Sequence, residues 1–400
     1  MARERLLLVT DEMEVGGSQR QITNLLDGLD HARWEPELLF FRRPSFLVAE
    51  IEQRGVRVHH LPKKGRVDPR FVLAYATLLR HGNYSMVHAF SLTAELWTAL
   101  ASMIVRRPPK LISSVRGLYL TESASFWRLK RFVVLRSTAV IANAHACAAA
   151  ASMHAGIARD RIEVVANGVA IPAAMPPEQR SVMRRQIGCP PDRPFGLFVG
   201  RCVVEKNLAC LIRALARLPG EQRPWMAFAG DGPLRAETEA LAVAAGVDGD
   251  IRFLGERTDA TELMQAADFL VLPSVQEGMS NAVLEAMASG CAVAASAVGG
   301  NPELIKDGVT GLLFGSNDHA ALATCLMRLA HDVELRQRMA AEALARVQSL
   351  HSVPAMVASM AAVYERSLAL PIPRLRTYSR MRRDRAASLP QARRDTETRP

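Results

Sequence analysis

The chain has 400 residues, 49% of them hydrophobic and 22% charged, which is the composition of a globular protein long enough for two domains. It contains no run of about 18 apolar residues, so we expect no membrane-spanning helix, and the apolar run at residues 6–9 is too short for a signal peptide. These features favour a cytoplasmic protein. The net charge of +10 is uneven, because residues 371–400 hold nine arginines and only three carboxylates.

The first 170 residues alternate between short apolar runs and helical patterns, which predicts a doubly wound parallel α/β domain. After the first strand, at residues 6–10, come Gly16 and Gly17 and a helix from Ser18, where Ser18 and Gln21 have the spacing of a capping box. Further strands are predicted at 37–41, 57–61, 86–88, 110–115, 139–142 and 161–165.

The second half repeats this alternation after a proline-rich segment, residues 171–194, which indicates an exposed linker. A second Rossmann-like domain is predicted over 195–350, with Asp318 as a helix N-cap and strands at 196–200, 225–229, 251–254, 269–272, 292–295 and 311–314. Residues 351–370 are expected to form a helix that packs back on the first domain. Residues 371–400 are expected to form a disordered basic tail. Two similar domains joined by a linker would face each other across a cleft.

The most informative motif is a pair of carboxylates around the loop after the predicted strand 269–272. Glu277 lies in that loop, Ser280 is a candidate N-cap, and Glu285 lies in the second turn of the next helix. Ligands of doubly wound sheets bind at this edge, where carboxylates can accept hydrogen bonds from sugar hydroxyls. Two solvated surface glutamates would be the ordinary alternative, but the strand–loop–helix context favours a binding site.

Two cations follow the first strand of the second domain, Arg201 directly after Gly200 and then Lys206. They precede a helix, whose first backbone N–H groups favour anions, so this segment would suit a diphosphate.

With these motifs the sequence resembles retaining glycosyltransferase family 4, the group 1 glycosyl transferases, which adopt the GT-B architecture of two Rossmann-like domains. The resemblance covers nearly the whole chain except the tail. It rests on the Glu277–Glu285 spacing, on Arg201 and Lys206, on the glycine pair after the first strand, and on Asn167-Gly168-Val169 at the close of the first domain.

The resemblance implies the roles of individual residues. Glu277 would contact the donor sugar, Glu285 the ribose, and Arg201 with Lys206 the diphosphate, so we name Arg201, Lys206 and Glu277 as catalytic. The remaining residues that the resemblance assigns to the donor are Gly16, Gly17, Gly255, Arg257, Gly278, Met279, Ser280 and Asn281. The implied partners are a UDP- or GDP-sugar and a glycan or lipid-linked acceptor, with no cofactor.

In one position the sequence departs from the family habit of a histidine beside the donor sugar. The strand 110–115 ends in Arg116, which cannot serve as a base because it stays protonated. His88, at the end of the preceding strand, is the other candidate, although a buried structural histidine is an equally good interpretation. Both remain acceptor-side candidates.

We expect no metal site. The six cysteines form no Cys-x-x-Cys pair, and Asp248-Gly249-Asp250, which has the Asp-x-Asp form of metal-dependent transferases, falls in a predicted surface turn.

Other classes of protein fit the sequence less well. A GT-B epimerase or phosphorylase would share the donor site. A nicotinamide-dependent oxidoreductase is disfavoured because neither first strand is followed by Gly-x-Gly-x-x-Gly. The arginine-rich tail would permit a nucleic-acid-binding protein, but the body shows no interleaved basic and aromatic surface.

A peripheral membrane contact is also predicted. Residues 126–136 read FWRLKRFVVLR, an amphipathic pattern in which Arg128, Lys130, Arg131 and Arg136 alternate with apolar residues. The basic tail adds attraction to an anionic surface.

Overall fold

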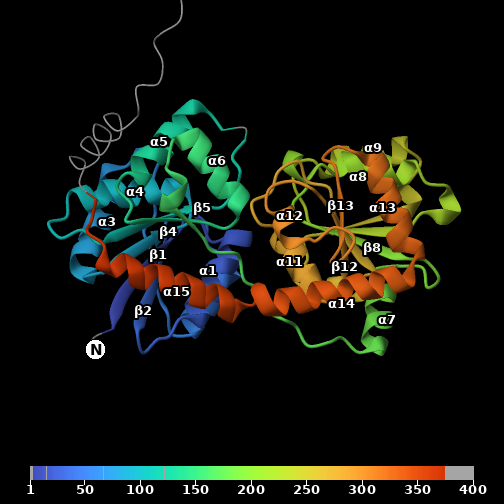
Figure 1. Cartoon of the computed structure of the whole chain (residues 1–400), viewed down its shortest axis with the longest axis horizontal. Helices are drawn as coiled ribbons and strands as arrows, with labels where there is room; N and C mark the ends of the chain where they lie inside the picture. Colours follow the sequence, from blue (N-terminus) through green and yellow to red (C-terminus); the bar gives the residue numbers. More distant parts are fainter. Residues whose placement is uncertain (1–2, 15, 66, 121, 374–400) are drawn as a thin grey trace, which may run out of the picture.

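The structure, a computed structural model, describes residues 3–373 apart from residues 15, 66 and 121. Two α/β domains lie side by side, and the helices at the end of the chain run along both of them (Figure 1). Each domain is built on one parallel sheet, with seven strands in the first and six in the second, which confirms the predicted GT-B arrangement.

The N-terminal domain has its sheet in the order β3-β2-β1-β4-β5-β6-β7. Its strands are β1 (Glu4–Val9), β2 (Trp34–Phe40), β3 (Arg57–His60), β4 (Met86–Ala89), β5 (Lys110–Val115), β6 (Ala139–Ala142) and β7 (Ile162–Val164). Its helices are α1 (Gly17–Gly28), α2 (Phe46–Gln53), α3 (Pro69–Gly82), α4 (Leu92–Met103), α5 (Ala124–Val134) and α6 (His145–Ala155).

The C-terminal domain has the equivalent order β10-β9-β8-β11-β12-β13. Its strands are β8 (Phe195–Val199), β9 (Trp225–Ala229), β10 (Ile251–Gly255), β11 (Phe269–Leu272), β12 (Ala292–Ser296) and β13 (Leu312–Phe314). The helices of this half are α7 (Pro177–Gln186), α8 (Leu208–Ala216), α9 (Arg235–Ala244), α10 (Ala260–Ala266), α11 (Asn281–Ala288), α12 (Asn301–Leu304), α13 (His319–His331) and α14 (Val333–Leu350).

The strand order reverses between β1 and β4 in one sheet and between β8 and β11 in the other. Ligands of doubly wound sheets bind at such reversals, outside the carboxyl ends of the strands. The central strands are almost wholly apolar because helices cover both faces of each sheet. The fold therefore leaves polar groups for the strand ends, where the two domains meet.

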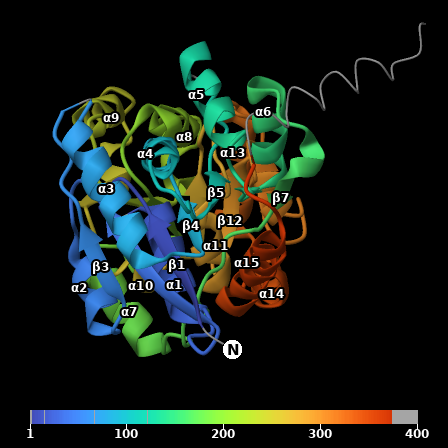
Figure 2. The ribbon, with the colours of Figure 1, turned by 90° about the vertical axis from the view of Figure 1, so that its left-hand side faces the viewer.

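The last helix, α15 (Val353–Ala369), returns to the N-terminal domain and packs beside α1 (Figures 1 and 2). Met356, Val357, Met360 and Val363 join that domain's core. The chain passes from one domain to the other near Val169 and again near Ser352, and a β-bridge between these two residues joins the two segments. In the linker, α7 is fixed to the C-terminal domain by Arg180, which bonds Asp268 at 2.8 Å.

Three predictions need comment. The predicted capping box at Ser18 is wrong, because α1 already begins at Gly17 after Gly16, and no side chain caps it. The tail lies outside the described residues from 374 onward. None of the helices in the part that the structure describes is long and apolar enough to span a bilayer.

Candidate functional site

The first group at the carboxyl edge of the C-terminal sheet is an ion pair between Lys206 and Glu277. Lys206 follows β8 and Glu277 follows β11, the two strands at the reversal, and Lys206 Nζ lies 2.5 Å from Glu277 Oε1. The hydroxyl of Ser274 donates to the same carboxylate oxygen at 2.6 Å. Arg201, the second residue after β8, is exposed, and its side chain has no hydrogen-bond or ion-pair partner among the described residues. Of the two cations at this edge, Lys206 is therefore paired with a carboxylate and Arg201 is not.

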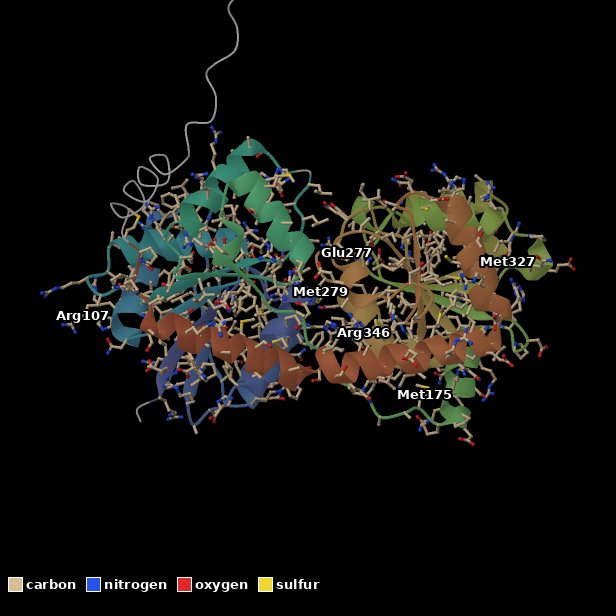
Figure 3. The ribbon with its side chains drawn as sticks, in the orientation of Figure 1. Arg107, Met175, Glu277, Met279, Met327 and Arg346 are labelled. Carbon is tan, nitrogen blue, oxygen red and sulfur yellow. The ribbon has the colours of Figure 1, made fainter. Side chains whose placement is uncertain are left out.

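Helix α11 begins beside this group. The hydroxyl of Ser280 accepts from the Val283 N–H at 3.4 Å, which confirms the predicted N-cap. Figure 3 shows Glu277 and Met279 at the side of the C-terminal domain that faces the N-terminal domain. The start of α11 and its partial positive charge are therefore directed to the junction between the domains.

Glu285, one turn further along α11, pairs across the junction with Arg20 of α1, whose Nη1 lies 2.9 Å from Oε1. Burial raises the pKa of Glu285, and the charge of Arg20 opposes that effect. Glu285, the residue predicted to bind the ribose, is thus paired with a residue of the opposite domain and is not free. A cavity of about 240 Å³ lies beside this pair, lined by Arg20, Asn281, Glu285 and residues 168–170.

A group of hydrogen-bonded amide side chains, Gln21, Asn167 and Asn281, also joins the two domains; we call this group the amide seam. Asn281 accepts from Asn167 Nδ2 at 2.8 Å and from Gln21 Nε2 at 3.3 Å, and its own Nδ2 donates to the Gly17 carbonyl at 2.8 Å. Gly17, Asn167 and Asn281, predicted from distant segments, therefore meet. Gly16 lies next to this seam, directly before α1.

The backbones of the two domains approach each other closely at Gly278. A Cβ placed there would lie 2.4 Å from the carbonyl oxygen of Arg116, so no larger residue fits without moving the domains apart. Nearby, Glu303 accepts the backbone N–H groups of His145 and Ala146, both at 2.8 Å, and so caps α6, whose own N-cap position is Ala144.

The two acceptor-side candidates differ in their surroundings. His88 is wholly buried, and its ring nitrogens contact the hydroxyls of Tyr364 at 2.6 Å and Ser114 at 2.7 Å. Burial lowers its pKa well below the ordinary histidine value. His88 therefore has the surroundings of a structural residue, whereas Arg116 is only partly covered and lies at the junction.

Other predicted residues lie at the margin of this group. Gly255 ends β10 and accepts a hydrogen bond from Gly230 N at 2.7 Å, while Arg257 pairs with Asp259 at 2.6 Å. Arg20 and Glu303 were missed, because each acts on a partner more than 150 residues away and no local pattern marks it.

The structure gives the Asp-x-Asp segment a structural role. Asp250 accepts from Arg193 at 2.8 Å and from Arg223 at 3.3 Å, away from the domain junction. Over residues 3–373, leaving out the three undescribed positions, no three His, Cys, Asp or Glu side chains gather as a metal site would need. The six cysteines are free and buried.

Two family models match the chain. Residues 179–346 match Glycosyl transferases group 1, and residues 15–171 match Glycosyltransferase Family 4, so together they span both domains.

Several relatives have similar sequences. EpsF of Bacillus subtilis is 27% identical over 319 residues, which is 77% of this chain and 80% of that protein. The lipopolysaccharide core biosynthesis glycosyltransferase LpsE of Rhizobium meliloti is 33% identical over 40% of this chain and 46% of its own length. The D-inositol 3-phosphate glycosyltransferase of Mycobacterium avium is 36% identical over 50% of this chain and 49% of its own. The match thus spans about half the length of these last two relatives.

Solved structures share the fold. HepE of Anabaena in complex with UDP-glucose superposes with a TM-score of 0.81 at 22% identity, over 90% of this chain and 99% of that one. WaaG, a glycosyltransferase involved in lipopolysaccharide biosynthesis, gives 0.69 at 19% identity, over 89% and 99%.

Proposed function

The chain belongs to the family 4, group 1 glycosyltransferases, which use nucleotide sugars, and on this premise we propose that it transfers a sugar from a UDP-sugar to a hydroxyl group of a glycan or lipid-linked acceptor, with retention of the anomeric configuration. The supporting observation is the edge formed by Arg201, Lys206 and Glu277. Two cations and a carboxylate follow the two strands at the reversal of the C-terminal sheet, and Glu277 lies on the side that faces the N-terminal domain (Figure 3).

The difficult step in such a transfer is the departure of the nucleoside diphosphate, because negative charge grows on the phosphate as the glycosidic bond breaks. Lys206 and Arg201, whose side chain has no partner among the described residues, would stabilise that charge. Fixed cations of this kind stabilise a transition state by about 3–4 kcal/mol each. Because Lys206 and Glu277 are in contact, the bond between phosphate and sugar would lie beside this pair, with Lys206 on the phosphate and Glu277 on the sugar hydroxyls.

Glu285 is the proposed ribose ligand. Its carboxylate lines the cavity beside α11 but is bound to Arg20. Binding of the ribose hydroxyls would therefore compete with, or be added to, this contact between the domains.

The relatives suggest the choice of donor and acceptor. HepE shares the fold and is seen with UDP-glucose, which favours UDP over GDP. LpsE acts in lipopolysaccharide core biosynthesis and the mycobacterial relative on an inositol phosphate, which favours a hydroxyl acceptor of the cell envelope or of a phosphorylated polyol.

A thermal-shift panel with UDP, GDP, ADP and their glucose conjugates tests the proposal, because a ligand that binds only the native state raises its melting temperature. We expect UDP and UDP-glucose to give the largest shifts. An unchanged melting temperature with every nucleotide would contradict the proposal. Product analysis separates the alternatives, since an epimerase changes its donor without any acceptor and a phosphorylase requires inorganic phosphate.

We further propose a peripheral contact with an anionic membrane surface, at a different place from the one predicted. In α5, Lys130 is only 2% exposed and bonds Glu95, so it is not a surface cation. Apolar residues are more exposed at the end of α4, where Met103 is 61% and Ile104 49% exposed against 43% for Leu129 of α5, and the basic pair Arg106 and Arg107 follows. Figure 3 shows Arg107 at the end of the N-terminal domain remote from the C-terminal domain.

The basic tail starts near this patch. Lys110, three residues after Arg107, donates to the carbonyl oxygens of Ser367, Leu368 and Leu370 and so fixes the end of α15. Each basic residue near an anionic bilayer contributes about 1 kcal/mol.

Co-sedimentation with anionic vesicles at low salt tests the contact. Met103→Glu should reduce the bound fraction, while the matched control Val243→Glu, at an exposed position of the other domain, should not. Failure of the intact chain to pellet, or equal binding by both variants, would contradict it.

A further inference from the structure

We propose that Arg116 is a receptor for a negatively charged group of the substrate, a carboxylate or phosphate carried by the transferred sugar or by the acceptor. The inference rests on the proposed function, because it takes the junction between the domains as the place of sugar transfer.

Arg116 is well placed for this role. It is the first residue after β5, at the carboxyl edge of the N-terminal sheet. Its carbonyl oxygen meets Gly278, the neighbour of Glu277. The residue therefore lies on the wall opposite the loop proposed to hold the donor sugar.

The contacts of the guanidinium are all uncharged. Its Nη2 donates to Asn167 Oδ1 at 2.8 Å, and its Cζ lies 5.4 Å from the centre of the Phe90 ring. Throughout the described part of the chain, no carboxylate comes within ion-pair distance of it. Its Nε and Nη1 have no hydrogen-bond partner in the described part of the chain, yet neither is sealed from solvent. Two donors are thus free and accessible.

Glu95, a buried carboxylate that bonds β5 two residues before Arg116, is paired with another cation. Glu95 accepts from Lys130 Nζ at 2.6 and 2.7 Å, from Ser113 Oγ at 2.8 Å and from Ser114 N at 2.7 Å. Glu95 is therefore paired with Lys130 and forms no ion pair with Arg116.

The remaining titratable groups around Arg116 carry no charge at neutral pH. His88 is kept neutral because burial and the charge of Arg116 both lower its pKa. Tyr119, Cys147 and Tyr364 are the other groups facing it, and burial raises the pKa of each, to about 12 for Tyr119 and Cys147. Burial lowers the pKa of Arg116 itself to about 10, so it stays charged.

An unpaired cation in such surroundings is costly, and groups of this kind concentrate at functional sites. The loop that follows Arg116 is also fixed by aromatic packing. Tyr119 has φ = 54°, a left-handed conformation that is rare for tyrosine. The centre of its ring lies 5.0 Å from that of Phe126 and 6.1 Å from that of Trp127. The loop is therefore preorganised, which reduces the entropy lost on binding.

The chemistry of the ligand follows from the free donors. A guanidinium binds carboxylate and phosphate oxygens with charge-assisted hydrogen bonds. A neutral hydroxyl could accept a hydrogen bond, but it would leave the charge uncompensated.

Calorimetry on the full chain tests the proposal in two arms. The donor arm compares UDP-glucuronate with UDP-glucose, which differ only in the carboxylate. The acceptor arm adds glucose 6-phosphate or glucose to protein saturated with UDP. In one arm the anionic member should bind about 10- to 100-fold more tightly than the neutral one, and that arm identifies the source of the charge.

Variants assign the effect to Arg116. Arg116→Met should reduce the affinity for the anionic probe to that for its neutral partner, and Arg116→Lys should keep part of the preference. Arg213→Met, at an exposed position of α8, is the matched control and should behave as wild type. If Arg116→Met does not fold, Arg116→Gln takes its place.

Three results would overturn the proposal. It fails if neither arm shows a preference, if Arg116→Met retains the preference, or if that variant weakens both members of a pair equally, as a purely structural role would. A wild-type chain without affinity for UDP would overturn the proposed function as well. UDP binding without an Arg116-dependent preference overturns this inference alone.

Discussion

Replacing Lys130 by methionine should cost the N-terminal domain about 3–5 kcal/mol of unfolding free energy. Lys130 Nζ contacts both oxygens of Glu95 at 2.6 and 2.7 Å, Ser113 Oγ at 3.1 Å and the Ser114 carbonyl at 2.5 Å, and both charged side chains are at most 2% exposed. Methionine would leave the carboxylate of Glu95 buried and unpaired. The cost is mainly that of the stranded charge rather than of the lost attraction.

Urea unfolding followed by tryptophan fluorescence measures this cost. Arg43→Met is the control, because its pair with Glu14 is 79% and 46% exposed and should contribute at most about 1 kcal/mol. Adding Glu95→Gln to Lys130→Met should recover part of the loss, since the stranded charge disappears. Equal losses for Lys130→Met and the control, or no recovery in the double variant, would refute the reasoning.

Four further predictions follow from the site and the core. Arg201→Ala and Lys206→Ala should each lower turnover about 100-fold or more, and a wild-type rate in either removes that residue from the mechanism. Glu285→Ala should weaken binding of bare UDP in calorimetry, whereas Glu277→Ala should mainly slow turnover of the UDP-sugar; equal losses would mean that their partners are misassigned. Activity should persist in EDTA, because Arg201 and Lys206 are proposed to compensate the charge of the diphosphate, and a loss restored by magnesium or manganese would contradict this. Burial opposes ionisation of Glu37, but hydrogen bonds from a histidine, a tyrosine and an arginine outweigh it and lower its pKa to about 2. The contribution of Glu37 to stability should therefore be complete above its unfolded pKa of about 4.3 and be lost as the pH falls towards 2. In a plot of the urea midpoint against pH, Glu37→Gln should flatten the slope over this acidic range.

Local signals in the sequence predicted the fold well. Buried parallel strands are short apolar runs, so the predictions at 110–115 and 225–229 match β5 and β9 at both ends. Asp318 was predicted as an N-cap, and its carboxylate accepts from the N–H groups of Ala320 and Ala321. The wrong capping box at Ser18 arose where two glycines precede the helix and make its start ambiguous from sequence.

The site was less predictable, because its contacts connect distant segments. Helical spacing placed Lys130 on a basic surface, since nothing near it in sequence indicates a buried partner at Glu95. Likewise, Glu285 could be recognised by its spacing from Glu277, but not its contact with Arg20, 265 residues away. Arg116 could be singled out only through the family resemblance, because it stands after a strand where many members have a histidine.

The return of α15 has a consequence for the order of folding during synthesis. The core of the N-terminal domain includes Met356, Val357, Met360 and Val363, which leave the ribosome after every strand of the C-terminal domain. We therefore expect the second domain to fold first, while the first waits with an uncovered groove beside α1. A chain that ends at residue 352, and so lacks α15, should have a protease-sensitive N-terminal half attached to a resistant C-terminal one, the reverse of the usual vectorial order.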